Sequence, residues 1–368
     1  MKNCTRSKCC LLVLGLFLPI ILITTAHTWY SGALYAGMSK TSIYMDRPIM
    51  AAAVTPPTPS PTVKTTPPIF FLKTHKTGSS AIQNILMRVV QRNNWTMAVG
   101  DGADYSRLCM GHHYDRHCPA NTEEMPYDII THHLRLNFTE IEASLKPNPA
   151  FISILRHPNA LIRSGYTYFK WTEQYNSLEK FLTRYKFLKF DPTIAIPYKN
   201  LMLYAFGLSY EDAKNTELVS RMISKIESRF DLIMIMEYFE ESLILLRHLL
   251  ALSIEQVAVF SVNKQSEKAT GSIGKVSHEA YRNLEIENSA DITLYETFLS
   301  IFKQKVQHFG VDRMEKEKTI LRNTIMDFQD ICSGQKNHTD KISVSDCLFL
   351  KMPELEFTMW YRHTHYLV

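Results

Sequence analysis

The sequence lacks three motifs that mark common nucleotide-binding and metal-binding proteins. No two aspartates stand two residues apart, so the Asp-x-Asp motif with which metal-dependent glycosyltransferases hold their ion is missing. The seven cysteines form no Cys-x-x-Cys pair, which argues against a zinc site. The Walker pattern GxxxxGK[ST] is also missing, which argues against an ordinary ATP-binding P-loop or a kinase of that type. A net charge of +5 over 368 residues is too small to require a nucleic acid partner.

Charged residues are absent from one long stretch near the N-terminus. No Asp, Glu, Lys or Arg occurs between Cys9 and Ser39, and residues 11–30 are mostly apolar. A bilayer core needs about 20 such residues, and the basic residues within 1–10 predict that this end stays in the cytosol. We therefore expect a cytoplasmic tail at 1–10 and a transmembrane signal anchor at 11–30 in a single-pass type II protein. A cleaved signal peptide is the alternative, but no convincing cleavage site follows the apolar core.

A stem is expected between the anchor and the folded domain. The run AAAVTPPTPSPTVKTTPP, residues 51–68, fills the second half of this segment, and its Pro/Thr composition cannot bury enough apolar surface to fold. Its threonines are candidates for O-linked sugars. We expect an extended luminal stem at 31–67 and one globular domain at 68–368.

Cysteines and sequons in the globular part suit an oxidising lumen. Four of the cysteines form two close pairs, and we expect the disulfides Cys109–Cys118 and Cys332–Cys347. Three Asn-x-Ser/Thr sequons beyond the anchor are candidate glycosylation sites: Asn94, Asn137 and Asn337.

Strand and helix patterns alternate through the globular part. Apolar runs at 69–73, 127–131, 150–155 and 230–236 predict four strands, and helices are expected over 79–90 and from about 240 to 251. Near-continuous apolar strands separated by helices indicate an α/β fold, with a P-loop-like parallel sheet flanked by helices on both faces. Ligands bind such sheets beyond the carboxyl ends of the strands.

A phosphate-binding turn is predicted where the first strand meets the first helix. The stretch FFLKTHKTGSS, residues 70–80, sets an apolar run against a polar turn and then a helical pattern. Backbone N–H groups and a helix dipole collect around an anion at such a junction. The candidate binding residues are Lys76, Thr77, Gly78, Ser79 and Ser80.

A second phosphate clamp follows the third strand. The stretch SILRHPNALIRSGYTYF places Arg156 at the strand end and Ser164 eight residues later on a helix. A guanidinium and a hydroxyl together hold a phosphate well. Either residue alone would be an ordinary surface or helix residue, so the pairing carries the prediction.

Together the two turns resemble those of sulfotransferases that use 3′-phosphoadenosine-5′-phosphosulfate (PAPS). The segments FLKTHKTGSSAIQNIL, THHLR, SILRHP and FDLIMIMEYFEESLILL are more narrowly similar to the Golgi galactose-3-O-sulfotransferases, which include the galactosylceramide enzyme. The resemblance covers roughly 69–250. It implies a Golgi membrane enzyme with a luminal catalytic domain, which transfers sulfate from PAPS to the 3-OH of a terminal β-galactoside on a glycolipid or glycan and releases adenosine 3′,5′-bisphosphate.

The resemblance also implies roles for the two clamps. Lys76 would stabilise the charge that develops on the leaving 5′-phosphate. Arg156 and Ser164 would hold the 3′-phosphate and so distinguish this donor from ATP. We expect no metal requirement, because Lys76 and fixed dipoles neutralise the charge.

The acceptor hydroxyl needs a base, and histidine is the usual choice. The stretch IITHHLRL offers His132 and His133 after the second strand, and His75 adjoins Lys76. We favour His133, because related carbohydrate 2-O-sulfotransferases carry their base in a T-x-H-V pattern and T-H-H-L aligns its second histidine with it. Arg135 is a candidate for contacting an acidic sugar or the sulfonate.

A late polar loop and several rival functions complete the predictions. The loop SVNKQSEKATGSIGK, residues 261–275, offers Lys264, Lys268 and Lys275 for closure over the nucleotide, with a solvated loop as the alternative. The rival functions are sulfation of another carbohydrate hydroxyl, a Golgi glycosyltransferase and a non-catalytic anchored binding protein. The missing Asp-x-Asp disfavours the second, and the intact clamps disfavour the third. A homodimer formed through the anchor is left open.

Overall fold

A computed structural model describes residues 66–100, 107–109, 111–192, 195–260, 276–337 and 342–366. The predicted tail, the anchor, nearly all of the stem and the late loop 261–275 lie outside these described residues. In the part that is described, no helix is both long and apolar enough to cross a membrane.

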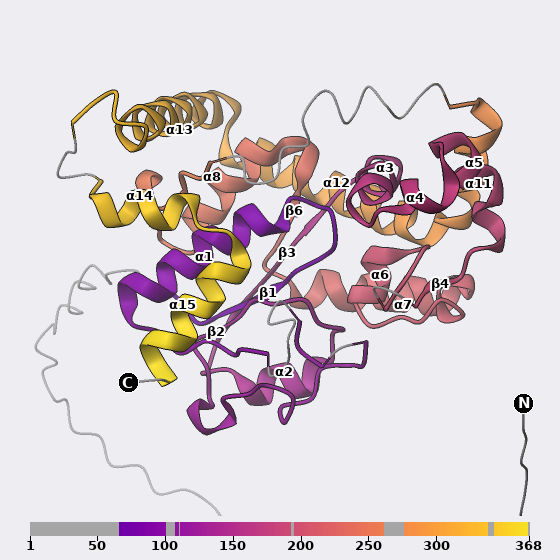
Figure 1. The fold of residues 1–368 in the computed structure, drawn as a ribbon, viewed down its shortest axis with the longest axis horizontal. Coiled ribbons are helices and arrows are strands. Elements are labelled where there is room, and N and C mark those ends of the chain that lie inside the picture. Colours follow the sequence, from indigo (N-terminus) through magenta and orange to yellow (C-terminus); the bar gives the residue numbers. More distant parts are fainter. Residues whose placement is uncertain are drawn as a thin grey trace, which may run out of the picture. The chain divides into compact units, whose positions relative to one another are not determined.

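Four parallel strands form the central sheet in the order β2-β1-β3-β6 (Figure 1). Their bounds are β1 Ile69–Leu72, β2 Ile129–Ile130, β3 Ala150–Leu155 and β6 Leu232–Ile235. Every neighbouring pair runs parallel. The sequence prediction of four strands in a parallel α/β sheet is therefore confirmed.

The strand side chains alternate between two apolar cores, one on each face of the sheet. In β1, Phe70 and Leu72 belong to one core, whereas Ile69 and Phe71 belong to the other. All four positions of β1 are buried. A strand that is covered on both faces must be apolar at every position, which is why it appears in the sequence as a continuous run.

Helices cover both faces of the sheet (Figure 1). The core containing Ile69 is covered by α1 (Ser79–Asn93), α8 (Phe239–Leu249), α9 (Ile254–Val257), α13 (Val311–Cys332), α14 (Val344–Lys351) and α15 (Glu354–Tyr366). The core containing Phe70 is covered by α2 (Phe138–Ser144), α3 (Pro158–Tyr168), α4 (Trp171–Tyr175), α5 (Leu178–Arg184), α6 (Leu201–Ala205), α7 (Thr216–Arg229), α11 (His278–Glu287) and α12 (Ser289–Phe309). The two helices expected over 79–90 and 240–251 are confirmed as α1 and α8. A small antiparallel pair, β4 (Phe190–Asp191) and β5 (Ile196–Pro197), lies apart from the main sheet.

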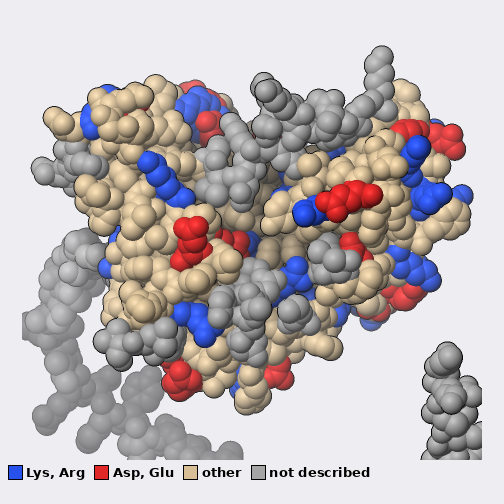
Figure 2. Space-filling model, in the orientation of Figure 1, with Lys and Arg blue, Asp and Glu red and all other residues tan. Residues whose placement is uncertain are grey.

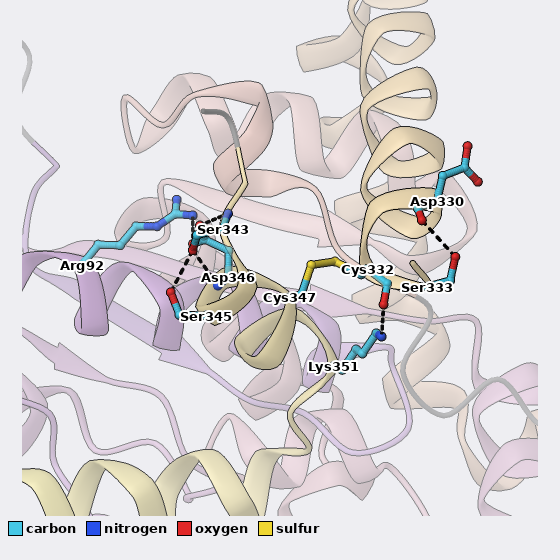
Figure 3. Close-up of a disulfide and its surroundings, with 9 residues drawn as sticks. All are labelled: Arg92, Asp330, Cys332, Ser333, Ser343, Ser345, Asp346, Cys347 and Lys351. Atoms are coloured by element: carbon cyan, nitrogen blue, oxygen red, sulfur yellow. Dashed lines mark hydrogen bonds and ion pairs between the residues drawn. A yellow bond between two sulfur atoms is a disulfide. The ribbon is translucent and has the colours of Figure 1, made fainter. Parts of the chain in front are cut away.

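Both predicted disulfides are present, Cys109–Cys118 and Cys332–Cys347. The second joins the end of α13 to α14 (Figure 3). In the same region Arg92, near the end of α1, pairs with Asp346 of α14 at 3.0 Å. The disulfide thus links α13 to α14, and the ion pair links α14 to α1.

The surface agrees with the small net charge. On the described part of the face in Figure 2, Lys and Arg side chains are interspersed with Asp and Glu and form no continuous basic tract. The three predicted glycosylation positions reach solvent to different degrees, because Asn94 and Asn337 are exposed and Asn137 is half-buried.

Candidate active site

Hydroxyl groups hold the turn between β1 and α1 in shape. The Thr74 hydroxyl donates to the Ile154 carbonyl of β3 at 2.6 Å, and the Ser79 hydroxyl donates to the Thr74 carbonyl at 2.6 Å. The Thr77 hydroxyl lies 2.8 Å from that of Thr74. These side chains are used internally, so the groups that can receive an anion are backbone N–H groups at the start of α1. The Ala81 N–H already donates to the Gly78 carbonyl at 3.1 Å, which leaves those of Ser79 and Ser80 as the candidates.

Two residues of this turn have a left-handed backbone. The φ angle is 58° at Lys76 and 79° at Gly78. A Cβ atom at position 78 would lie 2.4 Å from Met236 Sδ, so another residue there would have to adopt the left-handed backbone and also displace the Met236 side chain. Lys76 has no such freedom, and its backbone conformation costs roughly 1 kcal/mol. Strain of this kind is concentrated at functional sites.

The Lys76 ammonium lies beside other cations. Burial, helped by the charges of Arg156 and Lys73, lowers the pKa of Lys76 from 10.5 to about 8. Its Nζ atom lies 3.4 Å from the centre of the Tyr168 ring, at the end of α3. An ammonium that is held by an aromatic face and near like charges is well placed to bind an incoming anion.

Arg156 lies directly beside the Lys76 turn. It follows β3, the neighbour of β1, and its Nη1 donates to the Lys76 carbonyl at 3.0 Å. The pKa of Arg156 is lowered, because the effect of burial is larger than the opposing effect of the Glu237 charge. Ser164 is half-buried on α3, four residues before Tyr168, and therefore on the helix face whose aromatic ring contacts Lys76. The structure thus brings the two predicted clamps to one edge of the sheet.

His75 and His133 form a stacked pair, with ring centres 3.9 Å apart and an angle of 13° between the planes. His133 Nδ1 lies 2.9 Å from the Lys73 carbonyl. A carbonyl only accepts, so Nδ1 must carry the proton and Nε2 is the basic nitrogen of the neutral ring.

Burial and positive neighbours keep both rings neutral. Burial, followed by the charges of Arg107, Lys73 and Lys76, lowers the pKa of His75 to about 3. Burial is also the main cause that lowers the pKa of His133 well below 6.5, with His75 and Lys73 adding to it. A neutral His133 with a bare Nε2 has the chemical form that a general base requires.

The other two residues predicted after β2 have different surroundings. His132 is fully buried, and its Nε2 lies 3.1 Å from the Thr358 hydroxyl of α15. Arg135 donates to the Gly207 carbonyl at 3.1 Å, and its guanidinium stacks on Tyr204 at 4.3 Å. His132 therefore makes a contact inside the fold, whereas His75 and His133 lie together beside the Lys76 turn. The contacts of Arg135 are those of a residue that holds loops together.

Three further residues contribute to the site. Tyr168 contacts Lys76, and the buried Lys73 forms an ion pair with Glu354 of α15. The four-residue spacing between Ser164 and Tyr168 places both on one face of a helix, and this spacing is the signal in the sequence that indicates Tyr168. No local pattern indicates the ion pair, because its partners stand 281 residues apart. Among the described residues, no group of three or more His, Cys, Asp or Glu side chains is arranged to hold a metal ion.

Comparisons with known proteins point to one family. Residues 1–356 match a family described as Galactose-3-O-sulfotransferase. The chain is 30% identical to galactosylceramide sulfotransferase of Mus musculus over 363 residues, which cover 90% of this chain and 80% of that protein. It is 28% identical to Galactose-3-O-sulfotransferase 3 of Homo sapiens, with 76% and 68% covered. It is also 28% identical to Galactose-3-O-sulfotransferase 2 of Homo sapiens, with 88% and 81% covered.

Proposed function

This chain belongs to the galactose-3-O-sulfotransferase family, and we propose that it transfers sulfate from PAPS to the 3-OH of a terminal β-galactoside on a glycolipid or glycan. The observation that carries the proposal is the meeting of Lys76, Arg156 and His133 at one edge of the sheet. Sulfuryl transfer from a bisphosphorylated nucleotide requires a cation at each phosphate and a base at the acceptor hydroxyl.

Lys76 and the N-terminus of α1 would bind the 5′-phosphate. Sulfuryl transfer breaks the S–O bond to this phosphate and forms an S–O bond to the sugar, so the phosphate gains negative charge in the transition state. A fixed donor aimed at such developing charge contributes about 3 kcal/mol. The contact of the Lys76 ammonium with the Tyr168 ring supports this role, because it holds the ammonium beside the turn before the donor arrives.

Arg156 and Ser164 would hold the 3′-phosphate. The guanidinium is fixed by its bond to the Lys76 carbonyl, so the two clamps are held relative to each other. A nucleotide without a 3′-phosphate would make only one of the two contacts. This pairing supports PAPS rather than ATP as the bound nucleotide.

His133 would take the proton of the acceptor hydroxyl through Nε2. The Lys73 carbonyl fixes the tautomer, and the stacked His75 ring limits rotation of the imidazole. The low pKa keeps His133 unprotonated at the mildly acidic pH of secretory compartments.

We further propose that the protein is a Golgi membrane protein with one N-terminal anchor and a luminal catalytic domain. The uncharged stretch between Cys9 and Ser39, the Pro/Thr stem and the sequons support this orientation. The disulfides Cys109–Cys118 and Cys332–Cys347 support an oxidising compartment.

An acceptor panel tests the function. The detergent-solubilised full chain is incubated with radiolabelled PAPS and galactosylceramide, lactosylceramide or N-acetyllactosamine, with glucosylceramide as the matched control. We expect label at the galactose 3-OH of at least one galactoside, none on glucosylceramide, and none with the Lys76→Ala variant. A folded protein that binds adenosine 3′,5′-bisphosphate but labels no galactoside would contradict galactose as the acceptor.

A further inference from the structure

The C-terminal helix places a carboxylate against the phosphate-binding turn. Glu354, the first residue of α15, contacts the Lys73 ammonium through Oε2, and the same oxygen lies 3.5 Å from the Ser80 hydroxyl in the first turn of α1. The Lys73 side chain is 1% exposed and that of Glu354 18%. The other carboxylate oxygen of Glu354, Oε1, is buried and has no hydrogen-bond partner among the described residues.

Polar contacts along α15 hold this carboxylate in place. Asn84 of α1 donates to the Met352 carbonyl at 3.3 Å, two residues before α15 begins. Further along, Thr358 contacts His132, and the Tyr361 hydroxyl accepts from the Met97 N–H at 2.8 Å. α15 therefore lies beside α1, as Figure 1 also shows, and Glu354 is fixed relative to the turn.

Glu354 faces a group of positive charges. Lys73 contacts it directly, and the charge of Lys73 in turn lowers the pKa values of His75, Lys76 and His133. The carboxylate also lies at the N-terminal end of α1, the end to which an anion is attracted. It therefore repels the same phosphate that this turn would bind.

Lys73 connects this carboxylate to the base. Its ammonium is held by Glu354, and its carbonyl lies 2.9 Å from His133 Nδ1. One residue thus joins the C-terminal helix to the group that sets the tautomer of His133. A change at Glu354 reaches the base through a single side chain and its own backbone.

We propose that Glu354 is a positioning residue for sulfate transfer, which fixes Lys73 and through it His133, while its charge weakens binding of the anionic nucleotide. The inference rests on the proposed function and adds to it a residue that touches neither the base nor the expected position of the sulfate. It assigns opposite effects to one carboxylate, because positioning favours turnover and repulsion disfavours donor binding.

Glu354→Gln separates the two effects, since glutamine keeps the shape and removes the charge. Loss of repulsion should tighten adenosine 3′,5′-bisphosphate binding about three- to tenfold. Loss of the ion pair should lower kcat about tenfold, because the Lys73 side chain then loses its contact with α15 and the Lys73 carbonyl holds His133 less exactly. A purely structural defect would weaken binding and turnover together.

The experiment measures the Kd of adenosine 3′,5′-bisphosphate by calorimetry, kcat with PAPS and a galactoside, and thermal unfolding, all on the full chain. Glu356→Gln, at an exposed position of the same helix, is the matched control and should equal wild type in all three. Glu354→Asp keeps the charge, so it should bind the nucleotide as wild type does and regain part of kcat.

Two results would overturn the inference. One is a Glu354→Gln variant whose Kd and kcat both equal those of wild type. The other is a parallel loss of affinity and kcat that follows a loss of folded protein and is not reduced in Glu354→Asp. Failure of the proposed function gives a different pattern, because wild type itself would then transfer no sulfate, while the calorimetric comparison would still report the effect of the charge.

Discussion

At the scale of single residues, the same positive charges serve two purposes. Lys73, Lys76 and Arg107 form the cationic surroundings that favour an anion, and they also help to keep His75 neutral. Lys73 acts in the same way on His133. The proposed phosphate-binding site and the proposed histidine base are therefore compatible, because the charges that would attract the donor also disfavour protonation of the base.

Replacement of His133 tests its role as the base. His133→Ala should lower kcat about 100-fold or more, because no group would then accept the hydroxyl proton. Because the pKa of His133 is lowered, the imidazole stays neutral at pH values below the ordinary histidine pKa of 6.5. In wild type, kcat/KM for the donor should therefore stay level between about pH 7 and pH 6. Steady-state kinetics over this pH range measures both effects.

His132→Ala is the control for this prediction. His132 is buried against Thr358, so its loss should reduce thermal stability and lower kcat far less than the loss of His133 does. An inflection of kcat/KM near pH 6.5 in wild type would contradict the lowered pKa. Full activity in His133→Ala together with its loss in His132→Ala or His75→Ala would move the base to another histidine.

At the scale of elements, the strand–turn–helix unit from β1 to α1 depends on one glycine. Gly78→Ala should reduce the free energy of unfolding by about 1 to 3 kcal/mol, from the left-handed backbone and the displacement of Met236. It should also weaken adenosine 3′,5′-bisphosphate binding, because the first N–H groups of α1 shift. Chemical denaturation and calorimetry measure the two effects.

Gly334→Ala supplies a matched control. Gly334 has a φ of 82°, close to the 79° of Gly78, but a Cβ atom there would meet nothing within 4 Å. Gly334→Ala should reduce the free energy of unfolding only by the cost of the left-handed backbone, and it should leave nucleotide binding unchanged. Equal effects of the two variants on nucleotide binding would mean that the contact with Met236 does not shape the turn.

Elements with strong local patterns were predictable, and those that depend on distant partners were not. β1, β3 and β6 follow from apolar runs, because burial on both faces leaves no room for polar side chains. The run at 127–131 forms only Ile129–Ile130 as a strand, since Tyr127 instead forms an isolated bridge with Leu145. The pair β4 and β5 has two residues in each strand, which is too short for a periodic signal.

At the scale of the whole molecule, the site combines segments that are far apart in the chain. The parallel order β2-β1-β3 places the ends of three strands side by side, and each end supplies one predicted group: His133, Lys76 and Arg156. Topology therefore made these three residues predictable together. Glu354 was not predictable, because only the packing of α15 on α1 brings it to the turn.

The most direct test of the account is calorimetric binding of adenosine 3′,5′-bisphosphate and adenosine 5′-monophosphate to wild type, Lys76→Met and Arg156→Met. In wild type the 3′-phosphate should raise affinity about tenfold or more. Arg156→Met should remove this preference, whereas Lys76→Met should weaken both nucleotides alike. An Arg156→Met variant that keeps the full preference, or a Lys76→Met variant that binds both nucleotides as wild type does, would contradict the claim that these two cations bind one nucleotide.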